Sequence, residues 1–175
     1  EATCYYESAK DFDFRWERHS EFSTYTLISK KEISGSEHFN GFMSLDQEWI
    51  SNLKGEVISA NHIDLRLPQN APKEEDEFNQ YFDNEALIGS HIYDGNATVW
   101  TSVQSDQDGF SRVILIDEGL DPNQAGRAVR NLLELATYRS MTLLAWPVAR
   151  SLLPELGELE KSLNKTGEKL KKLEM

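Results

Sequence analysis

The stretch FSRVILIDEGLDPNQA at positions 110–125 decides the fold, because it holds a buried strand and the start of a helix. Its centre, VILI at 113–116, is typical of a strand that is buried on both faces. Shortly after it, Asp121 can cap a helix, Pro122 fits the first helical position, and Gln124 completes a capping box. The stretch therefore predicts a central strand that leads directly into a helix.

The sequence around this stretch is mostly typical of antiparallel strands. Apolar and polar residues alternate, β-branched and aromatic residues are frequent, and Asp94-Gly95 is a dipeptide of tight hairpins. The strand candidates are residues 11–19, 22–30, 56–67 and a three-stranded meander at 85–117. We expect an α+β fold, in which a mostly antiparallel sheet of about five or six strands is covered on one face by a long helix.

Two shorter elements are expected between the strands. Ser44 and Gln47 have the spacing of a capping box, so a short helix is predicted there, with Gly55 after its end. Residues 69–83 are polar and rich in acidic side chains, which indicates a surface segment with a helical turn around 73–82.

The C-terminal part of the chain is expected to be helical in two pieces. The helix from Pro122 should run to about Trp146, where Pro147 interrupts it. In the second helix, apolar residues recur at alternating spacings of four and three, as in a coiled coil. This set, here called the leucine seam, comprises Leu152, Leu156, Leu159, Leu163, Thr166, Leu170 and Leu173.

The leucine seam has two interpretations. It can be the core side of an amphipathic helix that packs on its own domain, or the contact line of a stalk. A helix that covers a sheet normally shows a broader apolar face, so the narrow seam favours a stalk. We therefore expect an α+β domain at 1–146 and the start of a coiled-coil stalk at 147–175, in a chain that is a fragment of a longer protein.

The composition limits the possible partners. The chain has 175 residues with 30 acidic and 18 basic side chains, which gives a net charge of -12. Such a surface repels nucleic acid and anionic lipid. The longest uninterrupted apolar run, 143–149, is far shorter than the roughly 20 residues of a spanning helix. Membrane contact is expected only through a segment that is not present in this chain.

Two predicted strands carry charged residues at alternate positions. Asp13, Arg15, Glu17 and His19 share one face of the first strand, and His62, Asp64 and Arg66 share one face of another. If the two strands are neighbours, Arg15 could meet Asp64 and Glu17 could meet Arg66. The pairs then either lie on a solvated face or line a polar groove for a small ligand or partner. The candidate binding residues are Arg15, Glu17, His19, His62, Asp64 and Arg66.

A further polar set lies on the long helix. The spacing of these residues places them along one stripe, and Arg130 and Glu134 can pair as i,i+4 neighbours. The stripe is either a solvated face or a polar network that connects the helix to the charged strands. Its members are Arg127, Arg130, Glu134, Tyr138 and Arg139.

No residue pattern points to catalysis, a metal or a cofactor. The histidines lack a third ligand at a suitable spacing. Gly-rich phosphate loops and a nucleophile elbow are absent from the sequence. No catalytic residue, metal ligand or cofactor is therefore assigned.

Several segments together resemble a bacterial family of predicted membrane-anchored proteins, known as domain of unknown function 3422. They are FRWERHSEFSTYT (14–26), EALIGSHIYDGNATVWT (85–101), DGFSRVILIDEGLDPNQAGRAVRNLLELATYRSMTLLAWPVAR (108–150) and the helix that follows. Residues 30–84 follow the family only loosely. The resemblance implies a longer parent protein whose helices continue toward a hydrophobic C-terminal segment, and it implies no established activity.

The sequence thus favours a non-enzymatic module that binds a partner or assembles through the helix at 152–173. The expected parent is membrane-anchored, with this domain soluble on the cytoplasmic side. The alternative is a small-ligand-sensing or enzymatic domain that uses a polar groove on the charged strands.

Overall fold

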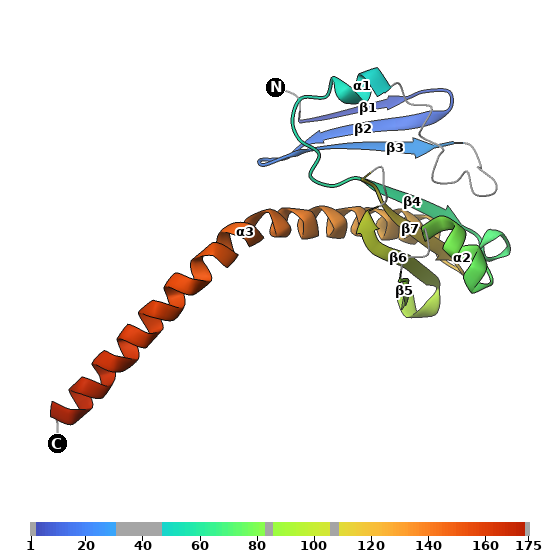
Figure 1. The fold of residues 1–175 in the computed structure, drawn as a ribbon. Helices are drawn as coiled ribbons and strands as arrows, with labels where there is room; N and C mark the ends of the chain where they lie inside the picture. Colours follow the sequence, from blue (N-terminus) through green and yellow to red (C-terminus); the bar gives the residue numbers. More distant parts are fainter. Residues whose placement is uncertain (1–2, 31–46, 83–85, 106–108, 174–175) are drawn as a thin grey trace. The chain divides into compact units, whose positions relative to one another are not determined.

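The computed structural model describes residues 3–30, 47–82, 86–105 and 109–173 (Figure 1). The chain divides into two compact units. One unit comprises residues 1–55 and 62–119, and the other comprises residues 56–61 and 120–175. The predicted boundary between 146 and 147 stays a prediction.

The N-terminal sheet has three antiparallel strands in the order β1-β2-β3. The strands are β1 (Cys4–Ser8), β2 (Phe12–Arg18) and β3 (Ser23–Ser29). In the register, Arg15 of the middle strand lies opposite Tyr6 of β1 and Thr26 of β3. The period-two pattern predicted β2, and the β-branched and aromatic composition predicted β3. It gave no sign of β1, all five residues of which are exposed.

The second sheet has four strands in the order β4-β7-β6-β5, and β5, β6 and β7 pair antiparallel. The strands are β4 (Asn61–Arg66), β5 (Ile88–Ile92), β6 (Ala97–Ser105) and β7 (Ser111–Asp117). Ile114 and Leu115 of β7 are both completely buried. Because successive residues point to opposite faces, β7 is buried on both sides, as its VILI core predicts.

Aromatic side chains from a short helix complete this core. Helix α2 (Glu75–Phe82) places Phe78, Tyr81 and Phe82 in the same cluster as Ile114 and Ile116. The sequence predicted the helical turn but treated the segment as surface. That interpretation was wrong for the aromatic side of the helix, because Phe78, Tyr81 and Phe82 stand at i, i+3 and i+4 and share one buried face among the acidic residues.

The β5–β6 hairpin closes with the tight turn that Asp94-Gly95 predicts. The N–H of Asn96 donates to the Tyr93 carbonyl at 3.1 Å. Asp94 has φ 56° and ψ 30°, and Gly95 has φ 90°, which are type I′ values. Tyr93 also has a positive φ of 51°, a conformation that is unfavourable for a bulky residue.

The long helix α3 (Pro122–Leu173) begins at the predicted cap. Asp121 Oδ1 accepts the backbone N–H groups of Asn123 at 2.8 Å and Gln124 at 2.9 Å. In return, Gln124 Oε1 accepts the Asp121 N–H at 2.9 Å. This reciprocal capping box fixes where the helix starts.

The prediction that Pro147 separates two helices was wrong, because α3 continues through both Pro147 and Pro154. A proline removes one N–H and crowds the carbonyl four residues earlier, which bends a long helix without ending it. The ribbon of α3 bends near the middle of its length (Figure 1).

The α+β class, the antiparallel pairing and the long C-terminal helix are confirmed. The strands, however, form two sheets of three and four strands instead of one sheet of five or six. Two short 3₁₀ turns, η2 (Pro68–Asn70) and η3 (Tyr93–Gly95), and a short helix α1 (Gln47–Ser51) complete the described elements. The predicted cap at Ser44 lies outside the described residues, and the covering of a sheet by the long helix stays a prediction.

Candidate functional site

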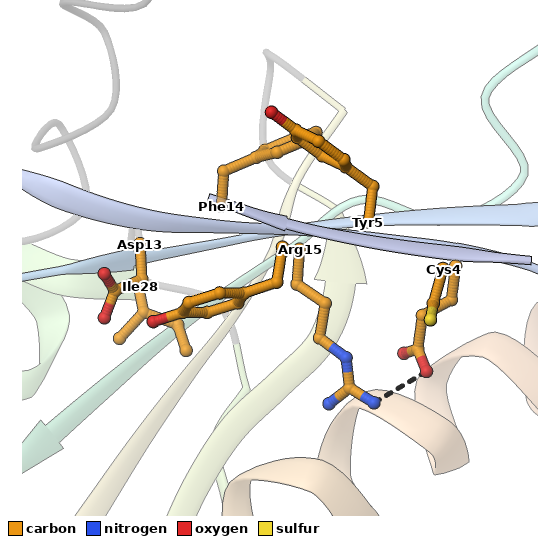
Figure 2. Close-up of a pocket in the computed structure, with 8 residues that line it drawn as sticks. Cys4, Tyr5, Asp13, Phe14, Arg15 and Ile28 are labelled. Carbon is orange, nitrogen blue, oxygen red and sulfur yellow. Dashed lines mark hydrogen bonds and ion pairs between the residues drawn. The ribbon is translucent and has the colours of Figure 1, made fainter. Parts of the chain in front are cut away.

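The polar face of the N-terminal sheet carries a shallow hollow of about 380 Å³. Figure 2 shows Asp13, Arg15, Cys4 and Ile28 on one side of the strands, with Phe14 and Tyr5 on the other. The lining residues are Cys4, Tyr5, Tyr6, Asp13, Phe14, Arg15, Glu17 and Ile28. Two of the three candidate residues predicted on the first strand, Arg15 and Glu17, therefore border one concave surface.

Two ion pairs fix the charges of this hollow. Arg15 Nη2 lies 2.6 Å from Glu17 Oε1, and the Arg15 side chain is 51% exposed. Lys30 Nζ lies 2.7 Å from Asp13 Oδ1, which also accepts the Ser8 hydroxyl at 2.7 Å. Exposed pairs of this kind contribute about 1 kcal/mol or less to stability. The two ion pairs place positive and negative side chains on the same open surface.

The hydrogen bonds from Lys30 and then Ser8 lower the pKa of Asp13 below its ordinary value. Donors that favour the ionised carboxylate have this effect. Asp13 therefore stays negatively charged at neutral pH and anchors Lys30 at the edge of the hollow.

His19, the third candidate on this strand, lies outside the hollow. It follows the end of β2, where its ring stacks on Phe22 with 4.4 Å between centroids. Its Nε2 atom lies 3.4 Å from the Thr24 hydroxyl. These contacts fit a residue that stabilises the turn between β2 and β3.

The charged face of β4 is not a solvated one, because Arg66 is buried and His62 and Asp64 are half-buried. Arg66 is only 5% exposed, whereas Leu65 on the opposite face is 46% exposed. Asp64 Oδ2 accepts Arg66 Nη2 at 2.6 Å and Nε at 2.8 Å. The guanidinium also lies over the Tyr81 ring, 4.5 Å from its centroid. Pairing and aromatic stacking offset the desolvation of these charges.

Burial acts to lower the pKa of Arg66, but the hydrogen bond to Asp64 and the interaction with Tyr81 raise it overall. The guanidinium therefore remains charged inside the domain. His62 on the same strand stacks on Phe110, with 4.2 Å between centroids. This half of the predicted site is a structural cluster on the buried side of β4.

The predicted pairs Arg15–Asp64 and Glu17–Arg66 were wrong. β2 pairs with β1 and β3, whereas β4 belongs to the other sheet and neighbours β7. Arg15 pairs with Glu17 and Arg66 pairs with Asp64, each two residues away on its own strand. Alternation identified which residues share a face, but it carries no information on which strands become neighbours.

The polar stripe of α3 is an exposed helix face. Arg130 Nε lies 2.8 Å from Glu134 Oε1, and the two side chains are 70% and 46% exposed. Arg127, Tyr138 and Arg139 are exposed as well. The predicted i,i+4 pair is confirmed, and a polar network that connects the helix to the charged strands stays a prediction.

The leucine seam is exposed along its described length. Leu152 is 49% exposed and Leu163 is 72% exposed, and Leu156 and Leu159 lie between these values. Thr166, the polar member, donates its hydroxyl to the Ser162 carbonyl at 2.9 Å. The seam is therefore an apolar line on one face of a continuous helix.

One hydrogen-bond chain was not anticipated from the sequence. The buried Thr98 hydroxyl donates to Glu118 Oε1 at 2.6 Å and lies 2.9 Å from His91 Nδ1. Because that hydroxyl proton points to the carboxylate, His91 Nδ1 must be the donor to Thr98. The Asp94-Gly95 turn implies that His91 lies opposite Thr98, but nothing in the sequence brings Glu118 to them.

Within the described ranges, no three His, Cys, Asp or Glu side chains are grouped so that they could hold a metal ion. None of the described helices combines the length and the sustained hydrophobicity that crossing a bilayer requires.

These features define a two-sheet α+β protein with a long C-terminal helix. The chain belongs to the family described as protein of unknown function (DUF3422), which matches residues 1–174. This confirms the family that the sequence segments resemble. No curated protein and no solved structure matches the chain.

Proposed function

We propose that this chain is a non-enzymatic module that assembles with partner helices through the leucine seam. The observation that carries the proposal is a regular line of exposed leucines on a helix that continues to Leu173. Large apolar side chains gain roughly 1.5–3 kcal/mol each when they leave water completely. A narrow line of them is the pattern by which helices pair.

The proposal extends to the parent protein. Its support is the family resemblance, which implies a longer bacterial protein anchored in a membrane beyond the region seen here. In that setting, the domain lies on the cytoplasmic side and the helix from Pro122 links it to the remainder of the protein. The single Cys4 fits a reducing compartment.

Light scattering coupled to size exclusion tests the assembly. We expect the wild-type chain to exceed the monomer mass, and Leu163→Glu to reduce that mass because it places a charge in the seam. Asn164→Glu is the matched control, since it introduces the same charge one position outside the seam. A wild-type monomer at high concentration would contradict the proposal, as would equal effects of the two variants.

The hollow on the N-terminal sheet supports a second candidate, the sensing of a small ligand. Arg15 offers a cation, Asp13 and Glu17 offer carboxylates, and Tyr6 offers a ring, within one open surface. That combination suits a small zwitterion with a carboxylate and an amine. His19 and His62 do not belong to this candidate ligand site.

Titration with a mixture of free amino acids, followed by NMR, tests the second candidate. We expect shifts at Arg15 and Glu17 that disappear in Arg15→Ala. Arg130→Ala, which also breaks an exposed ion pair, is the matched control. A spectrum that does not change at millimolar ligand would eliminate the candidate.

A further inference from the structure

The charges along the leucine seam change sign halfway along it. Residues 152–160, here called the acidic half, contain three glutamates and no basic residue. Residues 161–174, here called the basic half, contain five lysines and two glutamates. The two halves therefore carry formal charges of -3 and +3, although the chain as a whole is strongly acidic. A partner of the seam must match both charges in this order.

Neither the helix dipole nor pairing within α3 explains the glutamates of the acidic half. They lie about eight turns or more after the start of the helix at Pro122, and the dipole acts only within the first turn. Glu158 has a partner in its own helix, since Lys161 Nζ lies 2.8 Å from its Oε1 atom. Glu155 and Glu160 are exposed and have no basic residue three or four positions away in the sequence. Pairs at these spacings therefore do not account for them.

These two glutamates also lie directly beside the seam. With Leu156 at position a of a heptad and Leu159 at d, Glu155 is at g and Glu160 is at e. The e and g positions flank the contact line of a coiled coil and face the partner helix. In the basic half, Lys169 takes a g position. The flanks of the seam therefore carry both signs of charge, negative in one half and positive in the other.

A second copy in parallel orientation would place like halves side by side. In that orientation each g position faces the following e position of the other helix, so Glu155 would meet Glu160 of the second copy. Lys169 would meet Glu174 of the second copy, which offsets this repulsion only in part of the contact. The two acidic halves would repel each other along their length, as would the two basic halves.

An antiparallel second copy places the acidic half of each helix alongside the basic half of the other. With the two-fold axis near Lys161, where the sign changes, the a positions of one helix face the d positions of the other. Glu155 then lies in register with Lys169 of the second copy, once on each side of the axis. Like charges meet at one contact, where Glu160 lies opposite its own counterpart. The antiparallel orientation therefore has two favourable flanking contacts for one unfavourable contact, whereas the parallel one has equal numbers.

The chain's own domain is a poor match for the seam. Residues 1–121 contain 24 acidic and 9 basic side chains, so their surface would attract the basic half and repel the acidic half. Anionic lipid would act in the same way. Because α3 is one continuous helix to Leu173, the two halves cannot fold back on each other. A second copy of the helix presents both charges in the complementary order.

We propose that the leucine seam binds the same seam of a second copy of this chain in antiparallel orientation, with each acidic half alongside a basic half. The inference rests on the proposed assembly through the leucine seam and adds its partner and its direction. The contact is symmetric, because both copies use the same residues. The two copies of α3 therefore begin at opposite ends of the contact.

Charge reversal beside the seam tests the orientation, with the dissociation constant of self-association measured by sedimentation equilibrium of the full 175-residue chain. Glu155→Lys should raise this constant several-fold, because like charges then meet on both sides of the axis. Lys169→Glu should raise it as well, and the double variant should restore the wild-type value. Glu168→Lys is the matched control, since it makes the same change of charge at an outward f position and should not raise the constant. Circular dichroism of each variant verifies that α3 remains helical.

Spin labels measure the orientation directly. In a Cys4→Ser background, a single label is attached after Ser151→Cys in one variant and after Lys165→Cys in another, both at c positions of the heptad. In the antiparallel pair, the two labels at position 151 lie about 30 Å apart along the helix axis, and those at position 165 lie about 12 Å apart. Pulsed electron paramagnetic resonance should therefore give the longer distance for position 151.

Three results would overturn the inference. A dimer that Glu155→Lys strengthens, or in which both label pairs give the same distance, is parallel and leaves the proposed assembly through the seam intact. A dimer whose dissociation constant does not respond to Glu155→Lys has no charge matching beside the seam. A wild-type monomer at every concentration would overturn both the inference and the proposed assembly.

Discussion

At the scale of single residues, Arg66 is the most constrained charge in the described part of the chain. It is almost completely buried, donates twice to Asp64, and reaches the Asn70 carbonyl at 3.3 Å. The Tyr81 ring covers one face of the Arg66 guanidinium. Such a cluster connects β4, η2 and α2 through one side chain.

Removal of Arg66 should be strongly destabilising. Arg66→Ala leaves the mostly buried Asp64 carboxylate without its guanidinium, and loss of one partner of a buried pair costs about 3–5 kcal/mol. Arg15→Ala removes an exposed pair and should cost about 1 kcal/mol or less. Urea unfolding measures both, and similar costs for the two variants would contradict the role of Arg66.

Asp13 should titrate below an ordinary aspartate, because Lys30 and Ser8 hydrogen-bond its ionised form. Its folded pKa is lower than its unfolded value of about 3.9, so its contribution to stability is complete above about pH 4. The contribution is lost as the pH falls through the folded pKa. NMR titration should show that Lys30→Met raises the pKa of Asp13, whereas Lys10→Met leaves it unchanged; equal effects would contradict the assignment.

The sequence predicted the shared faces of individual residues but not their burial. Alternation correctly placed His62, Asp64 and Arg66 together. It then favoured Leu65 as the core side, since leucine is usually buried and arginine exposed. The buried and exposed faces of β4 are the reverse of this expectation, because Asp64 and Tyr81 compensate the buried charge of Arg66. Tyr81 comes from a different element, so its position was not readable from β4 alone.

At the scale of elements, the pairing of β5 with β6 depends on Gly89, which has no side chain. Gly89 lies opposite Trp100, and a Cβ at this glycine would lie 2.6 Å from the indole ring. The indole in turn packs against Phe78 of α2, with 4.9 Å between centroids. The glycine therefore lets the aromatic ring cover the edge strand.

Gly89→Ala should destabilise the chain by about 1–3 kcal/mol, the usual cost of overpacking. Ser90→Ala, at an exposed neighbour, should be nearly neutral. In a Trp100→Leu background the alanine should cost less, because the ring it meets is gone. Denaturant unfolding of the four variants measures this coupling, and a cost of Gly89→Ala that does not depend on Trp100 would refute the explanation.

Local chemistry made some elements predictable and left others open. The capping box at Asp121 and the turn at Asp94-Gly95 are short-range hydrogen-bond patterns, so the residues themselves specify them. The effect of Pro147 depends on whether the helix on both sides is stable enough to tolerate a bend. The division of strands between two sheets depends on contacts far apart in sequence, which periodicity does not encode.

At the scale of the whole molecule, assembly and stability should be coupled. Copies that associate through the seam bind only the folded helix, so association favours the folded state by mass action. The Tm of the wild-type chain should rise by a few degrees over a hundredfold increase in concentration. Leu163→Glu should abolish this dependence and Asn164→Glu should retain it. A wild-type Tm that is independent of concentration would contradict the coupling.

The buried Ala125 and Ala128 lie on one side of α3, and the leucine seam lies about 170° away around the helix axis. Deletion of the seven residues 147–153 would rotate everything downstream by only about 20°, because seven residues are nearly two full turns. Deletion of five residues would rotate it by about 140°, so the seam would come round toward the side of Ala125 and Ala128. The angle between these two faces of α3 is therefore nearly preserved by insertions or deletions of seven residues and is lost with those of five.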